Sequence, residues 1–352
     1  MELSLVCRSF QYGGGMERYQ MDLIRGFYEI GMKPNIYASK FDTNLPEYQF
    51  IHPIHINLKY IPKLFRNNFL SYISNKNKQN TEITITTTYT ASDVIICGGN
   101  HKGYLKASNK PASLMDSIKI KNEVNCLKQA KLVIAHSEMM KNELISLYEI
   151  NPEKITTIYP PVNIQRFNTI TWGNRQLLRK KFGFKENEII YLFPSTGHSR
   201  KGFDILKQYF SLSDLPIRLV IAGTPIKEEK NITSLGYCKN MEALYHAADF
   251  TIMASNYEPF GLTGIESILS GTPLIFAENI GCLEVLKNNF GFTFDRLDPY
   301  SLNIAIRKSI ERFKQHESAR IDSPNQCLKY NPELSAHISK LLEAINLTFR
   351  AK

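Results

Sequence analysis

The segment 258–266 carries two carboxylates, Glu258 and Glu266, eight positions apart with a glycine turn between them. The preceding run 250–255, FTIMAS, is mostly apolar and predicts a strand that ends just before the first glutamate. The following run 264–271 has the small and apolar spacing of a buried helix. We therefore expect Glu258 at the carboxyl end of a strand and Glu266 in the first turns of a helix.

The backbone between the two glutamates is expected to form an anion site. The amides of Gly261, Leu262 and Thr263 would point outward at the start of the helix, where unpaired N–H donors and the helix dipole favour a phosphate. A phosphate cradle flanked by carboxylates suits a nucleotide sugar, because the phosphates need donors and the sugar hydroxyls need acceptors. A structural turn with both glutamates solvated is the alternative.

The EPFGL run at 258–262, with SGTPL at 270–274, resembles the E(x7)E signature of the retaining GT-B glycosyltransferases of family 4. This resemblance implies an α/β protein with two facing Rossmann-like domains and a cleft between them. It also implies that Glu258 holds a sugar hydroxyl and steadies developing positive charge, and that Glu266 accepts from the ribose hydroxyls. Phe260, with the three residues after it, belongs to the same donor site by this resemblance.

A basic loop follows the apolar run 189–193. The segment 195–204, STGHSRKGFD, has the pattern of a strand end, a loop and a helix start. Its Arg200 and Lys201 match the family's basic pair, which the resemblance places at the leaving diphosphate. Fixed cations at that position lower the barrier to departure of the diphosphate. The alternative is a solvated basic turn.

A glycine loop separates the first predicted strand from the first predicted helix. Residues 13–15 are all glycine, and apolar positions recur at helical spacing over 19–30. Such a loop lets the backbone approach a phosphate or a sugar closely. The Gly-x-Gly-x-x-Gly spacing of dinucleotide enzymes is missing, which disfavours NAD. In the resembled family this loop faces the donor, which implicates Gly14 and Gly15.

A histidine follows another predicted strand of the first half, 93–97. Many members of the resembled family hold a histidine or aspartate at this place, in contact with the donor sugar beside the reacting carbon, and His101 matches it. Lys239, after the predicted strand 232–236, is expected near the nucleotide base. The sequence has no Asp-x-Asp motif and no metal-ligand spacing, so we expect no metal and no other cofactor.

The length of 352 residues suits two domains, each large enough for a full core. We predict an acceptor-binding domain over 1–165, onto which a C-terminal helix, 333–352, packs back, and a donor-binding domain over 166–332. The segment 154–167 resembles the family's crossing between domains. Predicted strands alternate with helices, as in a parallel sheet covered on both faces; they are 2–8, 34–38, 54–58, 82–88, 93–97, 131–136, 188–194, 217–223, 232–236, 249–254 and 273–276.

Composition indicates a globular chain without a membrane-spanning segment. Hydrophobic residues make up 43% of the sequence. No apolar run approaches the ~18 residues that a spanning helix needs. The six cysteines lie scattered without CxxC pairs and are expected to be reduced core thiols. We therefore expect a cytoplasmic protein.

The net charge of +10 is concentrated in one part of the sequence. Residues 51–131 hold twelve lysines and arginines against four aspartates and glutamates, a surplus of eight. Within them, 60–72 interleaves aromatic and basic residues, a pattern that suits contact with an anionic membrane surface. A phosphorylated acceptor would also fit this charge, whereas no nucleic-acid motif accompanies it.

Taken with the resemblance, these features predict a retaining, metal-independent transfer of a hexose from a nucleotide diphosphate sugar to a glycan or lipid-linked acceptor of bacterial lipopolysaccharide or capsule. UDP-sugars are the expected donors and GDP-mannose is the alternative. A nucleotide-sugar epimerase and a non-catalytic binding protein share this type of scaffold. A glycogen phosphorylase relative would need a longer chain and a pyridoxal lysine site.

Overall fold

The computed structural model describes residues 2–316 and 319–350. The chain divides into two compact units, one formed by Met1–Pro161 with Pro332–Lys352 and the other by Val162–Asn331. The boundary expected after residue 165 lies slightly beyond this division. No helix within the described ranges is long and apolar enough to cross a membrane.

The described part of the first unit contains a seven-stranded sheet in the order β3-β2-β1-β4-β5-β6-β7. Every neighbouring pair is parallel. Parallel strands buried on both faces require continuous apolar runs, and the VIIC sequence of β5 is buried at all four positions. The strands are β1 (Glu2–Val6), β2 (Asn35–Ala38), β3 (His52–His55), β4 (Glu82–Thr86), β5 (Val94–Cys97), β6 (Leu132–Ala135) and β7 (Ile155–Thr157).

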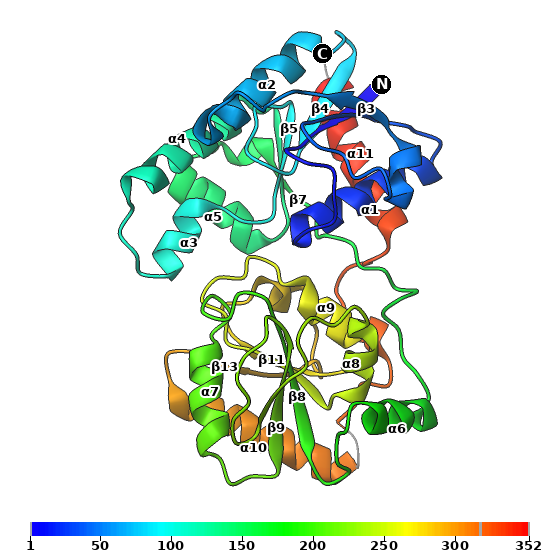
Figure 1. Ribbon diagram of the computed structural model, residues 1–352, viewed down its shortest axis with the longest axis vertical. Coiled ribbons are helices and arrows are strands. Elements are labelled where there is room, and N and C mark those ends of the chain that lie inside the picture. Colours follow the sequence, from blue (N-terminus) through cyan, green and yellow to red (C-terminus); the bar gives the residue numbers. More distant parts are fainter. Residues whose placement is uncertain (1, 317–318, 351–352) are drawn as a thin grey trace. The chain divides into compact units, whose positions relative to one another are not determined.

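Helices cover both faces of this sheet. Figure 1 shows α1 and α11 on one side and α2, α4 and α5 on the other. The C-terminal helix packs closely on the first helix, since a Cβ added to Gly26 would overlap the side chain of Ile338. The helices are α1 (Gly15–Glu29), α2 (Arg66–Asn77), α3 (His101–Ala107), α4 (Leu114–Gln129), α5 (Glu138–Tyr148) and α11 (Leu334–Arg350).

The described part of the second unit, 162–316 and 319–331, repeats this architecture with a six-stranded parallel sheet in the order β10-β9-β8-β11-β12-β13. Its strands are β8 (Ile189–Ser195), β9 (Ile217–Gly223), β10 (Ile232–Ser234), β11 (Phe250–Met253), β12 (Leu274–Ala277) and β13 (Gly291–Phe294). Its helices are α6 (Trp172–Lys181), α7 (Phe203–Leu212), α8 (Met241–Ala247), α9 (Leu262–Leu269) and α10 (Pro299–His316).

The predicted α/β class with two Rossmann-like, parallel-sheet domains is confirmed. Two strands were missed: β7 lies within the segment expected to cross between domains, and the glycine-led β13, GFTF, has no continuous apolar run. The predicted strand 54–58 is shifted, because β3 spans His52–His55. Helix α9 also begins two residues earlier than the predicted 264–271, so Glu266 lies in its second turn.

Candidate functional site

The candidate donor site lies where the strand order of the second sheet reverses. Strands β8 and β11 are neighbours, and their connections leave the sheet in opposite directions. The loops at the carboxyl ends of two such strands diverge and leave a crevice, the usual ligand position in open α/β sheets. The loop after β8 carries Arg200 and Lys201, and the loop after β11 carries Glu258.

Backbone contacts bind these two loops together. The amide of Asn256 donates to the carbonyl oxygen of Arg200 at 2.8 Å. Gly202 has a φ of +74°, and a Cβ at this position would overlap the carbonyl group of Ala254. A glycine is therefore required both by the backbone conformation and by the close approach of the two loops.

Arg200 and Glu258 form an ion pair across the two loops. The Nη1 atom of Arg200 donates to Oε2 of Glu258 at 2.8 Å and to the carbonyl oxygen of Tyr257 at 2.8 Å. The side chain of Arg200 is 38% exposed and that of Glu258 is 17% exposed. The predicted cation and the predicted carboxylate are thus direct partners, and the guanidinium retains exposed donors.

Lys201 turns inward beside this pair. Its Nζ donates to the carbonyl oxygen of Pro194 at 2.9 Å. Burial lowers the pKa of Lys201; Glu258 opposes this shift and Arg200 adds to it. Removal from water makes a lysine ammonium costly, so an anion arriving at this site would strongly favour its charged form.

The start of α9 has the form expected for a phosphate cradle. Gly261 is the N-cap residue with a φ of +89°, and no described side chain caps this helix. The adjoining amides of Leu262 and Thr263 occupy its first turn. Phe260 is only 4% exposed, and its ring lies 6.3 Å from the ring of Tyr330.

A neighbouring segment that the sequence analysis missed supports the loop before α9. The amide of Gly281 donates to the carbonyl oxygen of Glu258 at 3.0 Å, and the amide of Cys282 donates to that of Phe260 at 2.6 Å. A Cβ at Gly281 would overlap the carbonyl group of Pro259. The Gly-Cys pair after β12 was the available signal, since a glycine at a strand end often marks a close backbone approach.

The remaining predicted residues of the second unit differ in their surroundings. Glu266 is only 7% exposed and accepts a hydrogen bond from the Tyr245 hydroxyl at 3.0 Å. Lys239 is exposed, in the loop after β10, and its carbonyl oxygen accepts from Nη2 of Arg166 at 2.9 Å. The tyrosine fixes the glutamate carboxylate in the fold, whereas the lysine side chain extends into solvent.

The predicted residues of the first unit lie at the carboxyl ends of β1 and β5. Gly14 is the N-cap residue of α1. The side chain of Glu17 lies over this loop, because its Oε2 would be 3.2 Å from a Cβ added to Gly14, whereas a Cβ on Gly15 would meet nothing within 4 Å. Backbone at Gly15 is therefore the open part of the glycine loop.

His101 begins α3 and is held by two carboxylates of α4. Its ring Nε2 lies 2.7 Å from Oδ1 of Asp116, and its backbone amide donates to Oε2 of Glu123 at 3.1 Å. The Tyr148 hydroxyl also donates to Oε2 of Glu123. The sequence analysis named His101 but missed both carboxylates, although their spacing of seven places them on one face of a helix.

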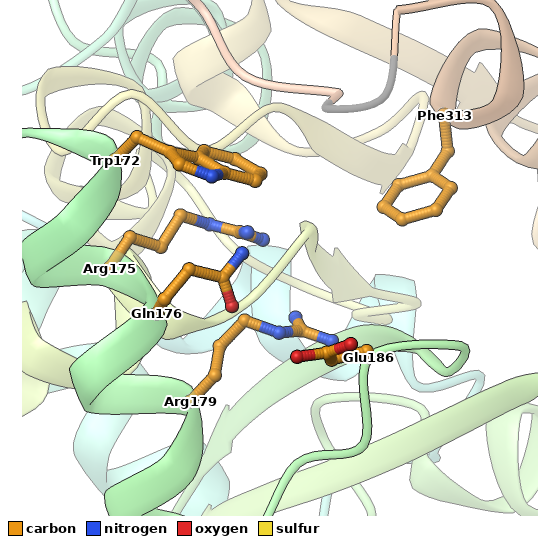
Figure 2. Close-up of a pocket in the computed structure, with 6 residues that line it drawn as sticks. All are labelled: Trp172, Arg175, Gln176, Arg179, Glu186 and Phe313. Carbon is orange, nitrogen blue, oxygen red and sulfur yellow. The ribbon is translucent and has the colours of Figure 1, made fainter.

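A cavity of about 360 Å³ in the second unit is a different feature from this site (Figure 2). Helix α6 contributes Trp172, Arg175 and Arg179 to the lining of this cavity. Both arginines bind the buried Asp249, which also accepts from the amide of Ile190 near the start of β8. The cluster therefore ties α6 to the amino ends of the strands, opposite to the loops that carry Arg200 and Glu258.

The predicted residues thus form two groups. Gly14, Gly15 and His101 belong to the first unit, and all the others belong to the second. Among residues 2–316 and 319–350, no three His, Cys, Asp or Glu side chains gather as a metal site. The expected independence from metal remains a prediction for an activity assay.

Two family models together match most of the chain. The model "Glycosyltransferase Family 4" matches residues 13–166, and "Glycosyl transferases group 1" matches residues 174–323. A probable transglycosylase of Burkholderia thailandensis is 33% identical over 350 residues, which cover 97% of this chain and 96% of that protein. The chain is a GT-B glycosyltransferase of family 4.

Solved structures with low sequence identity share the glycosyltransferase's fold. WaaG, a glycosyltransferase involved in lipopolysaccharide biosynthesis, aligns with a TM-score of 0.79 at 16% identity over 99% of both chains. The Anabaena protein HepE, solved in complex with UDP-glucose, aligns with a TM-score of 0.75 at 17% identity over 99% of this chain and 100% of that one.

Proposed function

We propose that this glycosyltransferase moves a hexose from a UDP-sugar to a glycan or lipid-linked acceptor, with retention at the anomeric carbon. The observation that carries the proposal is the meeting of Arg200, Lys201 and Glu258 at the strand-order reversal, beside the start of α9. Two cations and an uncapped helix start suit a diphosphate, and the adjacent carboxylate suits a sugar hydroxyl. The structure of HepE in complex with UDP-glucose supports UDP as the nucleotide of the donor.

In the proposed reaction the bond between the anomeric carbon and the diphosphate oxygen breaks while the acceptor oxygen attacks the same face. The acceptor hydroxyl gives its proton to the departing diphosphate. Arg200 and Lys201 stabilise the charge that develops on the leaving group. Glu258 holds a sugar hydroxyl and stabilises the positive charge near the anomeric carbon, and Glu266 accepts from the ribose hydroxyls.

The proposed setting is the cytoplasmic face of a bacterial membrane, where lipopolysaccharide or capsule precursors are extended. The similarity in fold to WaaG, a glycosyltransferase involved in lipopolysaccharide biosynthesis, supports this setting. The first unit carries the acceptor, and its basic segment 51–131 contacts anionic lipid reversibly. No metal and no further cofactor take part.

The test is incubation of the full chain with UDP-glucose, UDP-galactose, UDP-N-acetylglucosamine and GDP-mannose, with and without EDTA. We expect slow hydrolysis of one UDP-sugar, release of the sugar first as the anomer present in the donor, and the same rate with EDTA. Preference for GDP-mannose would replace the UDP assignment. Interconversion of sugars without hydrolysis would indicate an epimerase, and binding without turnover would indicate a non-catalytic protein.

A further inference from the structure

The strongest unassigned feature is a hydrogen-bonded chain in the first unit that runs from Ser113 through Asp116 to His101. The Ser113 hydroxyl donates to Oδ2 of Asp116 at 2.6 Å, and the Ser113 amide donates to the same oxygen at 3.0 Å. The other carboxylate oxygen, Oδ1, lies 2.7 Å from Nε2 of His101. Since the aspartate stands between serine and histidine, this order is not that of a hydrolase triad, in which histidine takes the serine proton.

The same contacts form part of the helix start. Ser113 is the N-cap residue of α4, and its hydroxyl oxygen accepts from the Asp116 amide at 3.2 Å, which completes a capping box. The position of the Asp116 carboxylate is therefore fixed by the helix itself. The side chains of His101 and Asp116 remain 17% and 20% exposed, so a ligand can reach the pair.

The protonation of Asp116 decides which histidine nitrogen carries the proton. The hydroxyl and backbone N–H of Ser113, and then the His101 ring, hold the pKa of Asp116 well below its usual range. An ionised carboxylate is an acceptor only, so the Nε2 atom that contacts it must carry the hydrogen. The neutral ring then has its lone pair on Nδ1.

We infer that Asp116 is the positioning residue for His101: it fixes the ring with the proton on Nε2, so that Nδ1 is the nitrogen that the ring offers as an acceptor to a sugar hydroxyl. This inference rests on the proposed sugar transfer and on the role that the family resemblance gives His101, which is contact with a sugar beside the reacting carbon. Nδ1 then accepts a hydrogen bond from a sugar hydroxyl. Glu123 completes the arrangement by holding the His101 backbone from two turns further along α4.

The decisive variant is Asp116→Asn, which preserves size and an acceptor for the capping box but can also present N–H groups to the ring. We expect kcat with the preferred nucleotide sugar to fall by about 100-fold or more, with little change in KM, as for a group that acts mainly in the transition state. Nitrogen-15 NMR of the histidine rings, assigned with His101→Gln, should show the Nε2–H form in the unmodified chain and its loss in Asp116→Asn.

Two controls separate positioning from helix stability. Ser113→Ala removes the capping hydroxyl but leaves the carboxylate, and should retain the Nε2–H form with a much smaller loss of kcat. Lys119→Gln removes an exposed ammonium 3.9 Å from Oδ1 of Asp116 and should retain full activity. If Ser113→Ala lost as much activity as Asp116→Asn while its ring stayed in the Nε2–H form, the aspartate would act through the helix cap alone.

The outcomes distinguish this inference from the proposed function. Failure of the unmodified chain to turn over any nucleotide sugar would reject the function, whereas the NMR measurement needs no turnover. Asp116→Asn with unchanged kcat, or a ring that carries its proton on Nδ1 in the unmodified chain, would overturn the positioning role.

Discussion

The Nη1 atom of Arg200 lies 2.8 Å from Oε2 of Glu258, although 58 positions separate the two residues in the sequence. The two loops hold the cation predicted for the diphosphate and the carboxylate predicted for the sugar in direct contact, so each side chain orients the other. A preformed arrangement of this kind avoids reorganisation during the reaction. The half-exposed guanidinium can keep its bond to Glu258 and offer its other N–H groups to a phosphate.

Arg200→Lys should reduce kcat/KM by about 100-fold, close to the loss seen when one preorganised donor is removed from a reaction site. A lysine keeps the charge. It lacks the planar guanidinium that can donate hydrogen bonds to the Glu258 carboxylate, the Tyr257 carbonyl and a phosphate at the same time. Arg218→Lys is the matched control, because Arg218 also pairs with a glutamate, Glu188, in this unit. Equal effects of the two substitutions on kcat/KM would argue against a special role for Arg200.

Lys201 predicts a pH dependence of donor binding. Burial lowers the pKa of Lys201, so above this lowered value, yet below the ordinary 10.5, the free protein carries a neutral amine. A bound diphosphate favours the ammonium, and binding must therefore take up a proton in this alkaline range. Calorimetry of UDP binding in buffers of different ionisation enthalpy should show proton uptake, with affinity that falls as pH rises. Lys201→Ala should abolish the uptake and lower turnover by about 100- to 1000-fold.

Glu266→Gln should weaken the binding of UDP and of the UDP-sugar to the same extent. The lost bond joins a charged acceptor to the ribose, which is worth about 1.5–3 kcal/mol, or roughly 10- to 150-fold in Kd. Tyr245→Phe is the companion variant, since it removes only the hydroxyl that donates to Glu266. We expect a smaller loss there. Unchanged UDP affinity of Glu266→Gln by calorimetry would exclude the ribose role.

The candidate donor residues could be placed at strand ends from the sequence, because they follow apolar runs long enough to predict strands. Strands of a parallel sheet bring their carboxyl ends to one edge, which is how Arg200 and Glu258 come into contact. Residue spacing alone does not predict the contact between Arg200 and Glu258. It also does not predict the supporting roles of Gly281 and Asp116. Those depend on loops whose paths are set by tertiary packing rather than by periodicity.

The sequence also left the direction of single side chains open. Phe260 stands between two predicted donor contacts, yet its ring packs inside the unit. Lys201 follows Arg200 directly and still turns toward the strand end rather than toward Glu258. In an irregular loop the side chains of adjacent residues point in directions that follow no regular period. These orientations could therefore be read only from the structure.

Gly281→Ala should impair both stability and turnover. The added methyl group would overlap the Pro259 carbonyl, and relief of the overlap must move the loop that carries Glu258. Overpacking of this kind costs about 1–3 kcal/mol in the free energy of unfolding. Gly173→Ala in α6 is the control, because a Cβ there meets nothing within 4 Å. Gly173 is exposed and lies in the first turn of α6, so this substitution should not lower the free energy of unfolding. Urea denaturation and the hydrolysis assay together measure both effects.

The surface around the start of α2 predicts reversible binding to anionic membranes. Three aromatic side chains there are exposed to solvent: Tyr60 at 83%, Phe65 at 57% and Tyr72 at 60%. Phe69, by contrast, packs against the cluster that contains Leu70. Exposed aromatic rings beside lysines suit the boundary between headgroups and acyl chains. Each nearby basic residue adds about 1 kcal/mol of attraction to an anionic surface, and salt screens this attraction.

Co-sedimentation of the full chain with vesicles tests this surface. The protein should pellet with anionic vesicles at low salt, leave them at high salt, and ignore neutral vesicles. Replacement of Tyr60, Phe65 and Tyr72 by serine should weaken binding, whereas replacement of two exposed apolar residues of the second unit, Leu212 and Tyr300, should not. Both variants should hydrolyse the nucleotide sugar at the unmodified rate, because neither change touches the donor residues. If the unmodified chain pelleted with neither anionic nor neutral vesicles, a soluble acceptor would be favoured instead.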